Sequence, residues 1–96
     1  MTNKDTERIM TLHPENKKGV NISLAKYNII KDFIIKTLKK HGELSFEKLT
    51  DLAIAELTEK FDGKVIWYVV TVKLDLEARK IITRIPKTSP HKLKLS

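Results

Sequence analysis

Hydrophobic positions in the first half of the chain recur at helical spacing. Between residues 24 and 40 apolar side chains return every three or four residues, which places them on one face of a helix. Ser23 is a suitable N-cap for this helix and Gly42 a suitable C-terminal cap. A second stripe follows Ser45, another N-cap, and we expect Asp62-Gly63 to end it. The pattern predicts two helices, with inward residues Tyr27, Ile29, Ile30, Phe33, Ile34, Leu38 and His41 in the first and Phe46, Leu49, Ala53, Leu57 and Phe61 in the second.

The segment "KVIWYVVTVKLDLEARKII", residues 64–82, fits two periods. Val70, Val72, Leu74 and Leu76 alternate with more polar residues, which is typical of a strand. Val65, Val69, Val72 and Leu76 recur at helical steps, which is typical of a helix. The β-branched residues favour the strand and "LDLEARK" favours the helix. Periodicity alone leaves both interpretations open.

The two ends of the chain differ in character. Residues 1–22 form an arm of mixed charge, punctuated by Pro14 and Gly19, whose apolar residues we expect to pack partly on the domain at 23–96. At the other end "IITRI" and "LKLS" read as short strands around the loop "PKTSPHK". A C-terminal β-hairpin is therefore predicted.

This order of elements matches a winged helix-turn-helix if the ambiguous segment is helical. "VKLDLEARKIITRIP" resembles the end of a winged-helix third helix running into its first wing strand, with Lys80 where glycine is frequent. The strings "LHPENKKGVNISLAKYNIIKDFI", "FDGKVIWYVVTVKLDLEARKIITRIP" and "SPHKLKL" resemble an uncharacterised family of short bacterial proteins, a domain of unknown function. The resemblance implies a winged-helix-like domain in a bacterial cytoplasm and no known activity. We therefore expect an α+β, mostly α fold: a winged helix-turn-helix with three helices and a C-terminal β-hairpin wing.

Positive charge is concentrated at the C-terminal end. The chain carries a net charge of +7, yet residues 1–78 hold 13 basic and 12 acidic side chains, and residues 79–96 hold six basic ones and no acid. Such a patch attracts phosphate backbones through counterion release. It also keeps a small domain soluble, and charge alone does not separate these roles.

Candidate nucleic-acid contacts lie in the wing and on the third helix. Arg84, Lys87, Lys92 and Lys94 suit phosphates, His91 adds charge when protonated, and Thr88 and Ser89 are possible donors. If Val65, Val69, Val72 and Leu76 are buried, the outward side of the third helix offers three further polar candidates. These are Lys64, Tyr68 and Thr71.

The remaining outward positions favour a different partner. Trp67, Val70 and Leu74 form an apolar stripe, which is protein-contact chemistry more than base-reading chemistry. Asp75, also expected outward, repels phosphates. Alternatively, Trp67 folds under the arm and completes the core. The primary hypothesis is a small DNA-binding regulatory module that contacts phosphates through its wing, and the alternative is a protein-interaction or homodimerisation module that uses the Trp67 face.

Composition argues against several other classes. The chain has no cysteine, its three histidines lie in separate elements, and its three glycines form no phosphate-binding loop. No apolar run reaches the roughly 18 residues that a membrane span needs. We therefore expect a cytoplasmic, non-enzymatic protein with no metal, cofactor or small-molecule substrate.

Overall fold

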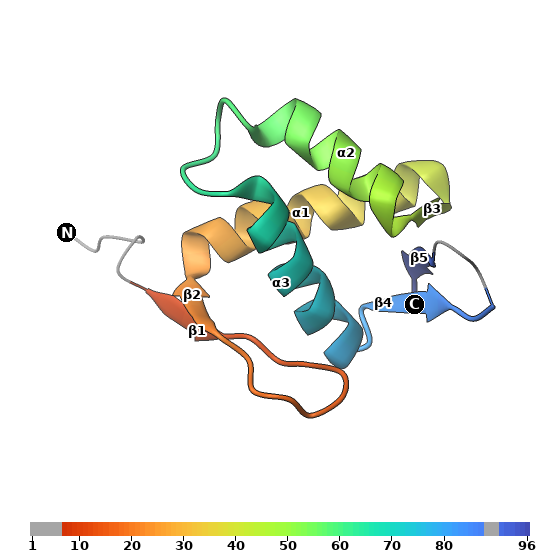
Figure 1. Cartoon of the computed structure of the whole chain (residues 1–96), viewed down its shortest axis with the longest axis horizontal. Coiled ribbons are helices and arrows are strands. Elements are labelled where there is room, and N and C mark those ends of the chain that lie inside the picture. The colour runs from red at the N-terminus through yellow and green to blue at the C-terminus, as the bar shows by residue number, and fades with distance from the viewer. Residues whose placement is uncertain (1–6, 88–90) are drawn as a thin grey trace.

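The part of the chain described by the structure, a computed structural model, comprises residues 7–87 and 91–96. This part is α+β and mostly helical, with three helices and two small antiparallel sheets (Figure 1). The elements follow in the order β1 (Arg8–Met10), β2 (Asn21–Ser23), α1 (Leu24–His41), β3 (Glu43–Ser45), α2 (Phe46–Leu57), α3 (Val65–Ala78), β4 (Ile82–Ile85) and β5 (Lys92–Leu95).

Both predicted N-caps are confirmed. The Ser23 hydroxyl accepts a hydrogen bond from the Lys26 amide at the start of α1, and the Ser45 hydroxyl accepts one from the Lys48 amide at the start of α2. Gly42 follows α1 with a φ of 82°, a left-handed conformation that glycine adopts without steric cost. Local hydrogen bonding thus sets where these helices begin and where α1 ends.

The second helix ends earlier than predicted. It stops at Leu57, and a turn through residues 58–60 leads to Phe61, whose amide still bonds the Leu57 carbonyl at 2.8 Å. Phe61 is buried as expected, although it lies beyond the helix. Gly63 is required just after it, because a Cβ there would lie 2.9 Å from the Tyr68 ring.

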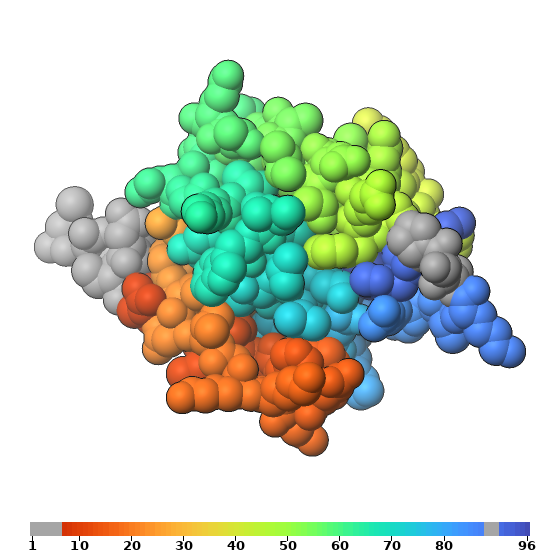
Figure 2. Space-filling view, in the orientation of Figure 1, coloured from red at the N-terminus to blue at the C-terminus, as the bar shows by residue number. Residues whose placement is uncertain are grey.

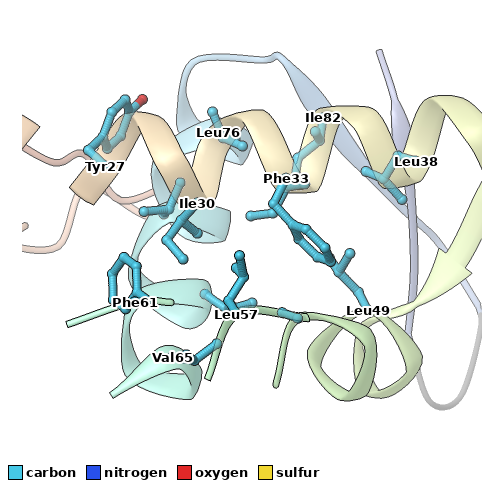
Figure 3. Packing of buried hydrophobic residues seen from close by; sticks show 14 of the residues in the cluster. Tyr27, Ile30, Phe33, Leu38, Leu49, Leu57, Phe61, Val65, Leu76 and Ile82 are labelled. Carbon is cyan, nitrogen blue, oxygen red and sulfur yellow. The ribbon is translucent and has the colours of Figure 1, made fainter. Parts of the chain in front are cut away.

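The core lies where the three helices meet. Side chains of α1 point into the space between α2 and α3, and the buried residues of the latter two helices fill it from the other side (Figure 3). α1 buries Phe33 and leaves Ile29 and His41 exposed, so the inward placement of the last two was wrong. The core consists of Ile22, Tyr27, Ile30, Phe33, Ile34, Leu38, Leu49, Ala53, Leu57, Phe61, Val65, Val69, Val72, Leu76, Ile82 and Leu93.

The ambiguous segment is helical, as the order of elements favoured. α3 buries Val65, Val69, Val72 and Leu76, the four positions with helical spacing. It stands at the centre of the molecule, packed on α1 and α2 (Figure 1). Tertiary burial of this face prevails over the strand preference of its β-branched residues.

The predicted C-terminal hairpin is also confirmed. β4 and β5 pair antiparallel, with Arg84 opposite Leu93, and β5 also pairs with β3, with Leu44 opposite Leu93. The strand order is β3-β5-β4. The short link between the first two helices is therefore an edge strand that holds the hairpin against the helices. Thr88 and Ser89 lie outside the described residues.

The arm forms its own two-stranded sheet. β1 and β2 pair antiparallel, with Ile9 opposite Ile22, and Ile22 enters the core. The loop between them closes on itself, because Thr11 and Val20 exchange three hydrogen bonds of 2.8–3.0 Å through the Thr11 amide and hydroxyl. Gly19 permits this closure, since a Cβ there would clash with the Thr11 carbonyl. Residues 1–6 of the predicted arm lie outside the described residues.

Candidate functional site

The outward side of α3 is apolar along its length. Ile66, Trp67 and Val70 are 52%, 44% and 37% exposed, and Leu74, half-buried, continues the row one turn further. Ile66, Val70 and Leu74 are spaced by four residues, so they lie one above the other on one side of the helix. We call these four residues the α3 stripe. Figure 2 shows the surface of α3 open between α2 above and the arm below.

The arm borders the α3 stripe without covering Trp67. Leu12 and Val20 of the arm lie beside Thr71 and Leu74, and both are exposed, at 45% and 38%. These arm and α3 residues line a hollow of about 80 Å³, and the exposed Lys18 also lines it. We call this feature the arm hollow. Within the described residues the alternative in which the arm buries Trp67 is wrong, because Trp67 is 44% exposed and the arm attaches to α3 at a different residue.

That residue is Asp75, which is fully buried and not outward as expected. Its carboxylate accepts the Leu12 amide at 2.8 Å, the Tyr27 hydroxyl, and the Arg79 guanidinium at 2.9–3.0 Å. Three donors from the arm, α1 and α3 thus satisfy one buried charge. Asp75 therefore joins the arm to the helices. Because its carboxylate is buried and paired with Arg79, it does not present a negative charge that would repel a phosphate.

The Asp75 carboxylate in turn shifts the pKa values of two of its donors, Tyr27 and Arg79. Burial and, to a smaller extent, the hydrogen bond to Asp75 together raise the pKa of Tyr27 to about 12. The hydrogen bond to Asp75 also raises the pKa of Arg79. Tyr27 therefore stays a neutral donor, and Arg79 a charged one, throughout the ordinary pH range.

The second acidic residue of α3, Glu77, is also paired with a cation. The Lys73 ammonium lies 2.9 Å from the Glu77 carboxylate, and both side chains are largely buried. The Phe46 ring lies 5.1 Å from this ammonium and stacks on His91, with ring centroids 5.5 Å apart. This packing closes the C-terminal hairpin against α2 and α3. Asp75–Arg79 and Lys73–Glu77 share an i,i+4 spacing, the sequence signal from which their pairing could have been predicted.

His91 belongs to this packing more than to the open surface. Its Nε2 atom is buried and has no hydrogen-bond partner among the described residues. Burial lowers the pKa of His91, and the positive charges of Lys73 and Arg84 lower it further. The charged form that a phosphate contact needs is therefore populated at lower pH than for an ordinary histidine.

The cations of the C-terminal hairpin point to two faces of the sheet. Arg84 stands opposite Leu93, which is buried, so the two side chains share the face toward the helices. Lys92 and Lys94 alternate with Leu93 and take the other face, where Lys92 lies 3.5 Å from Glu43. Lys87 is exposed in the turn after β4. The predicted phosphate contacts thus do not form one continuous surface.

The three polar candidates of α3 are also dispersed. Lys64 is exposed at the residue before the helix. Tyr68 is half-buried, with its ring edge-on to Trp67 and Phe61, and the Lys26 ammonium lies 5.6 Å from its centroid. Thr71 lines the arm hollow. Ile66 was not among the outward residues predicted from the sequence. It stands four residues before Val70, and this spacing is the signal from which it could have been predicted as part of the stripe.

Within residues 7–87 and 91–96 no three His, Asp or Glu side chains gather so as to hold a metal ion. Among the same residues no helix is long and apolar enough to cross a membrane. What the geometry defines is a small α+β protein with an uncovered apolar helix side, flanked by two hairpins.

The chain belongs to a family of unknown function, DUF6958, whose profile matches residues 8–93. The match covers the arm hairpin, the three helices and the C-terminal hairpin as far as Leu93. No curated protein and no solved structure matches the chain.

Proposed function

We propose that this protein is a non-enzymatic winged-helix domain that acts as a protein-interaction module through the α3 stripe. The observation that carries the proposal is the exposure of three adjacent large apolar side chains on a helix that also buries its opposite side. A helix that is apolar all round is normally buried all round. Contiguous exposed apolar surface with an aromatic anchor is typical of protein contacts.

The order and pairing of the elements support the winged-helix interpretation. Two helices precede α3, a β-hairpin follows it, and β3 joins the hairpin in one sheet. In DNA-binding winged helices the helix in the place of α3 presents polar side chains to base edges. The α3 stripe instead carries no charge and no hydrogen-bonding group apart from the Trp67 indole nitrogen, so base reading by this side is disfavoured.

A site-specific crosslinker tests the proposed contact. Benzoylphenylalanine replaces Trp67 in cells of the natural host, and the matched control places it at Ile29, an apolar residue of α1 with 47% exposure. We expect one discrete covalent adduct on irradiation at position 67 and none at position 29. Equal patterns at the two positions would contradict the proposal, because they would report random collisions.

DNA binding through the wing is the second candidate function. Two observations favour it: Arg84, Lys87 and Lys94 are exposed, and both acids of α3 are paired with cations. Contact would then be mainly to phosphates, with little sequence preference. Fluorescence anisotropy of a labelled random duplex at several salt concentrations tests it.

The expected signature is weakening with a log–log slope of about −3, as three phosphate contacts give at roughly −0.9 each. Replacing Arg84, Lys87 and Lys94 with Gln should remove the binding, whereas the control pair Lys39→Gln and Lys40→Gln, on the exposed end of α1, should change it little. Absence of binding at low salt would exclude this candidate and leave the protein-contact proposal intact.

A further inference from the structure

We propose that the occupant of the α3 stripe is an acidic amphipathic helix of another protein, an inference that rests on the function proposed above. The first step concerns shape. The α3 stripe runs along the helix to Leu74, and Leu74 lines the arm hollow together with Leu12 and Val20 of the arm; we call the stripe and the hollow together the groove. The arm hollow, about 80 Å³, has room for one aliphatic side chain at its floor of Thr71 and Leu74.

An elongated apolar groove selects an elongated apolar ligand. Ile66, Val70 and Leu74 are spaced by four positions over two turns, with Trp67 beside Ile66, so an amphipathic helix laid along the groove can contact them through anchors at i, i+3, i+4 and i+7. One anchor of that helix would enter the arm hollow, and the others would pack on Trp67, Val70 and Ile66. The backbone of the groove is fixed, because Asp75 ties the arm to α3 at Leu12.

The second step concerns charge. Lys18 stands at the rim of the arm hollow and Lys64 at the N-terminal end of α3, where the helix dipole is also positive. The acids of α3 do not offset these charges, since Asp75 is bound by Arg79 and Glu77 by Lys73. A helix with glutamates beside its apolar face therefore complements the groove at both ends.

A second copy of this chain fits less well. The chain carries a net charge of +7, so two copies repel each other at the distances of an interface. An acidic partner is attracted by the same charge, which raises its rate of encounter. The argument therefore favours an acidic helix of a different protein.

The test uses the full chain and its single tryptophan. Trp67 lies on the groove, so its emission reports any ligand that covers it. Three tryptophan-free helical peptides of about 18 residues share one Leu-rich face with anchors at i, i+3, i+4 and i+7 and differ only in flanks of Glu, Gln or Lys. Binding is followed by the blue shift of Trp67 emission and by protection from acrylamide quenching.

We expect the Glu-flanked peptide to bind about three- to tenfold more tightly than the Gln-flanked one, which is the effect of two exposed ion pairs, and the Lys-flanked peptide to bind most weakly. Added salt should narrow these differences. In the double variant Lys18→Gln, Lys64→Gln the Glu-flanked and Gln-flanked peptides should bind with equal affinity. The matched control Lys39→Gln, Lys40→Gln should still bind the Glu-flanked peptide more tightly. Val70→Asp, or Leu12→Ser where Val70→Asp reduces folding, should weaken all three peptides.

Other outcomes overturn the inference in distinguishable ways. Equal binding of the Glu and Gln peptides removes the acidic specificity and leaves the protein-contact proposal standing. If no peptide binds and Trp67 emission shifts with protein concentration as the mass doubles in sedimentation, the occupant is a second copy. If neither occurs, and crosslinking at position 67 also fails, the proposed function falls together with the inference.

Discussion

The two long sides of α3 are similar in composition and opposite in surroundings. One side presents Val65, Val69, Val72 and Leu76 to the core, and the other presents Ile66, Trp67, Val70 and Leu74 to solvent at its N-terminal end and to the arm hollow further on. Apart from Thr71, which also lines the arm hollow, the residues on both sides are apolar. An apolar side that stays uncovered lowers solubility and contributes little to folding, and this exposure is the basis of the proposed role in binding.

The edges between these two sides carry the charges. Asp75 and Arg79 join α3 to the arm on one edge, and Lys73 and Glu77 face Phe46 and the C-terminal hairpin on the other. Two hairpins are thus fixed beside the uncovered side without closing over it. The comparison teaches that the polar residues of α3 serve mainly to hold its neighbours, and that its apolar residues divide between core and surface.

The largest expected effect is on stability, and it distinguishes the buried side of α3 from its outward side. Leu76→Ala should lower the free energy of unfolding by about 4 kcal/mol, because it leaves a cavity in a fully buried site. Leu74→Ala, the same change two residues earlier on a half-buried site, should cost about 1 kcal/mol or less. Urea denaturation followed by circular dichroism measures both. Equal costs would show that the stripe is as well packed as the core.

The next effect concerns the attachment of the arm. Asp75→Ala should lower the free energy of unfolding by about 3 kcal/mol, since it leaves the buried Tyr27 hydroxyl and the part-buried Leu12 amide without their acceptor. Hydrogen exchange should show that the Leu12 amide loses protection first. The control Asp51→Ala, on the exposed side of α2, should change stability by less than about 0.5 kcal/mol. A protected Leu12 amide in the Asp75 variant would contradict this account.

A smaller effect is expected on the uncovered side. Ile66→Gln should change the free energy of unfolding by no more than about 0.5 kcal/mol, because half of the side chain is already in water. The same variant should bind the Glu-flanked peptide described above more weakly than the unchanged protein does. A loss of stability comparable to that of Leu76→Ala would show that Ile66 belongs to the core and would remove it from the stripe.

The smallest effect is a dependence on pH at the C-terminal hairpin. The pKa of His91 is lowered in the folded protein, so the unfolded chain binds more protons as the pH falls below the ordinary value of 6.5. Stability should therefore be constant above about pH 7.5 and decline from pH 6.5 downward until the folded pKa is reached. Thermal melts between pH 8 and pH 5 measure this decline, and His91→Gln should reduce it. An unchanged profile in that variant would assign the decline to other groups.

Local sequence determined most of the elements. Ser23 and Ser45 form hydrogen bonds with amides three residues further on, and these contacts follow from sequence neighbours alone. The helical period of Val65, Val69, Val72 and Leu76 was present as well, although the strand period competed with it until the order of elements favoured the helix. The C-terminal hairpin was predicted from the short apolar strand "IITRI" and the alternating segment "LKLS" around a loop with two prolines, and the structure confirms it at residues 82–95.

Tertiary structure alone decided the candidate site. Whether Trp67 is covered depends on the route of the arm, and that route is set by a hydrogen bond between Leu12 and Asp75, 63 residues apart. The separation of Arg84 from Lys92 and Lys94 depends on the register of β4 against β5, which sets Arg84 opposite Leu93. Periodicity describes how one element divides its residues between sides; it does not say which side a distant segment will cover, because that contact is made between elements. For this protein the sequence therefore determined that α3 is apolar on two sides, and only the folded chain determined which of them remains available to a partner.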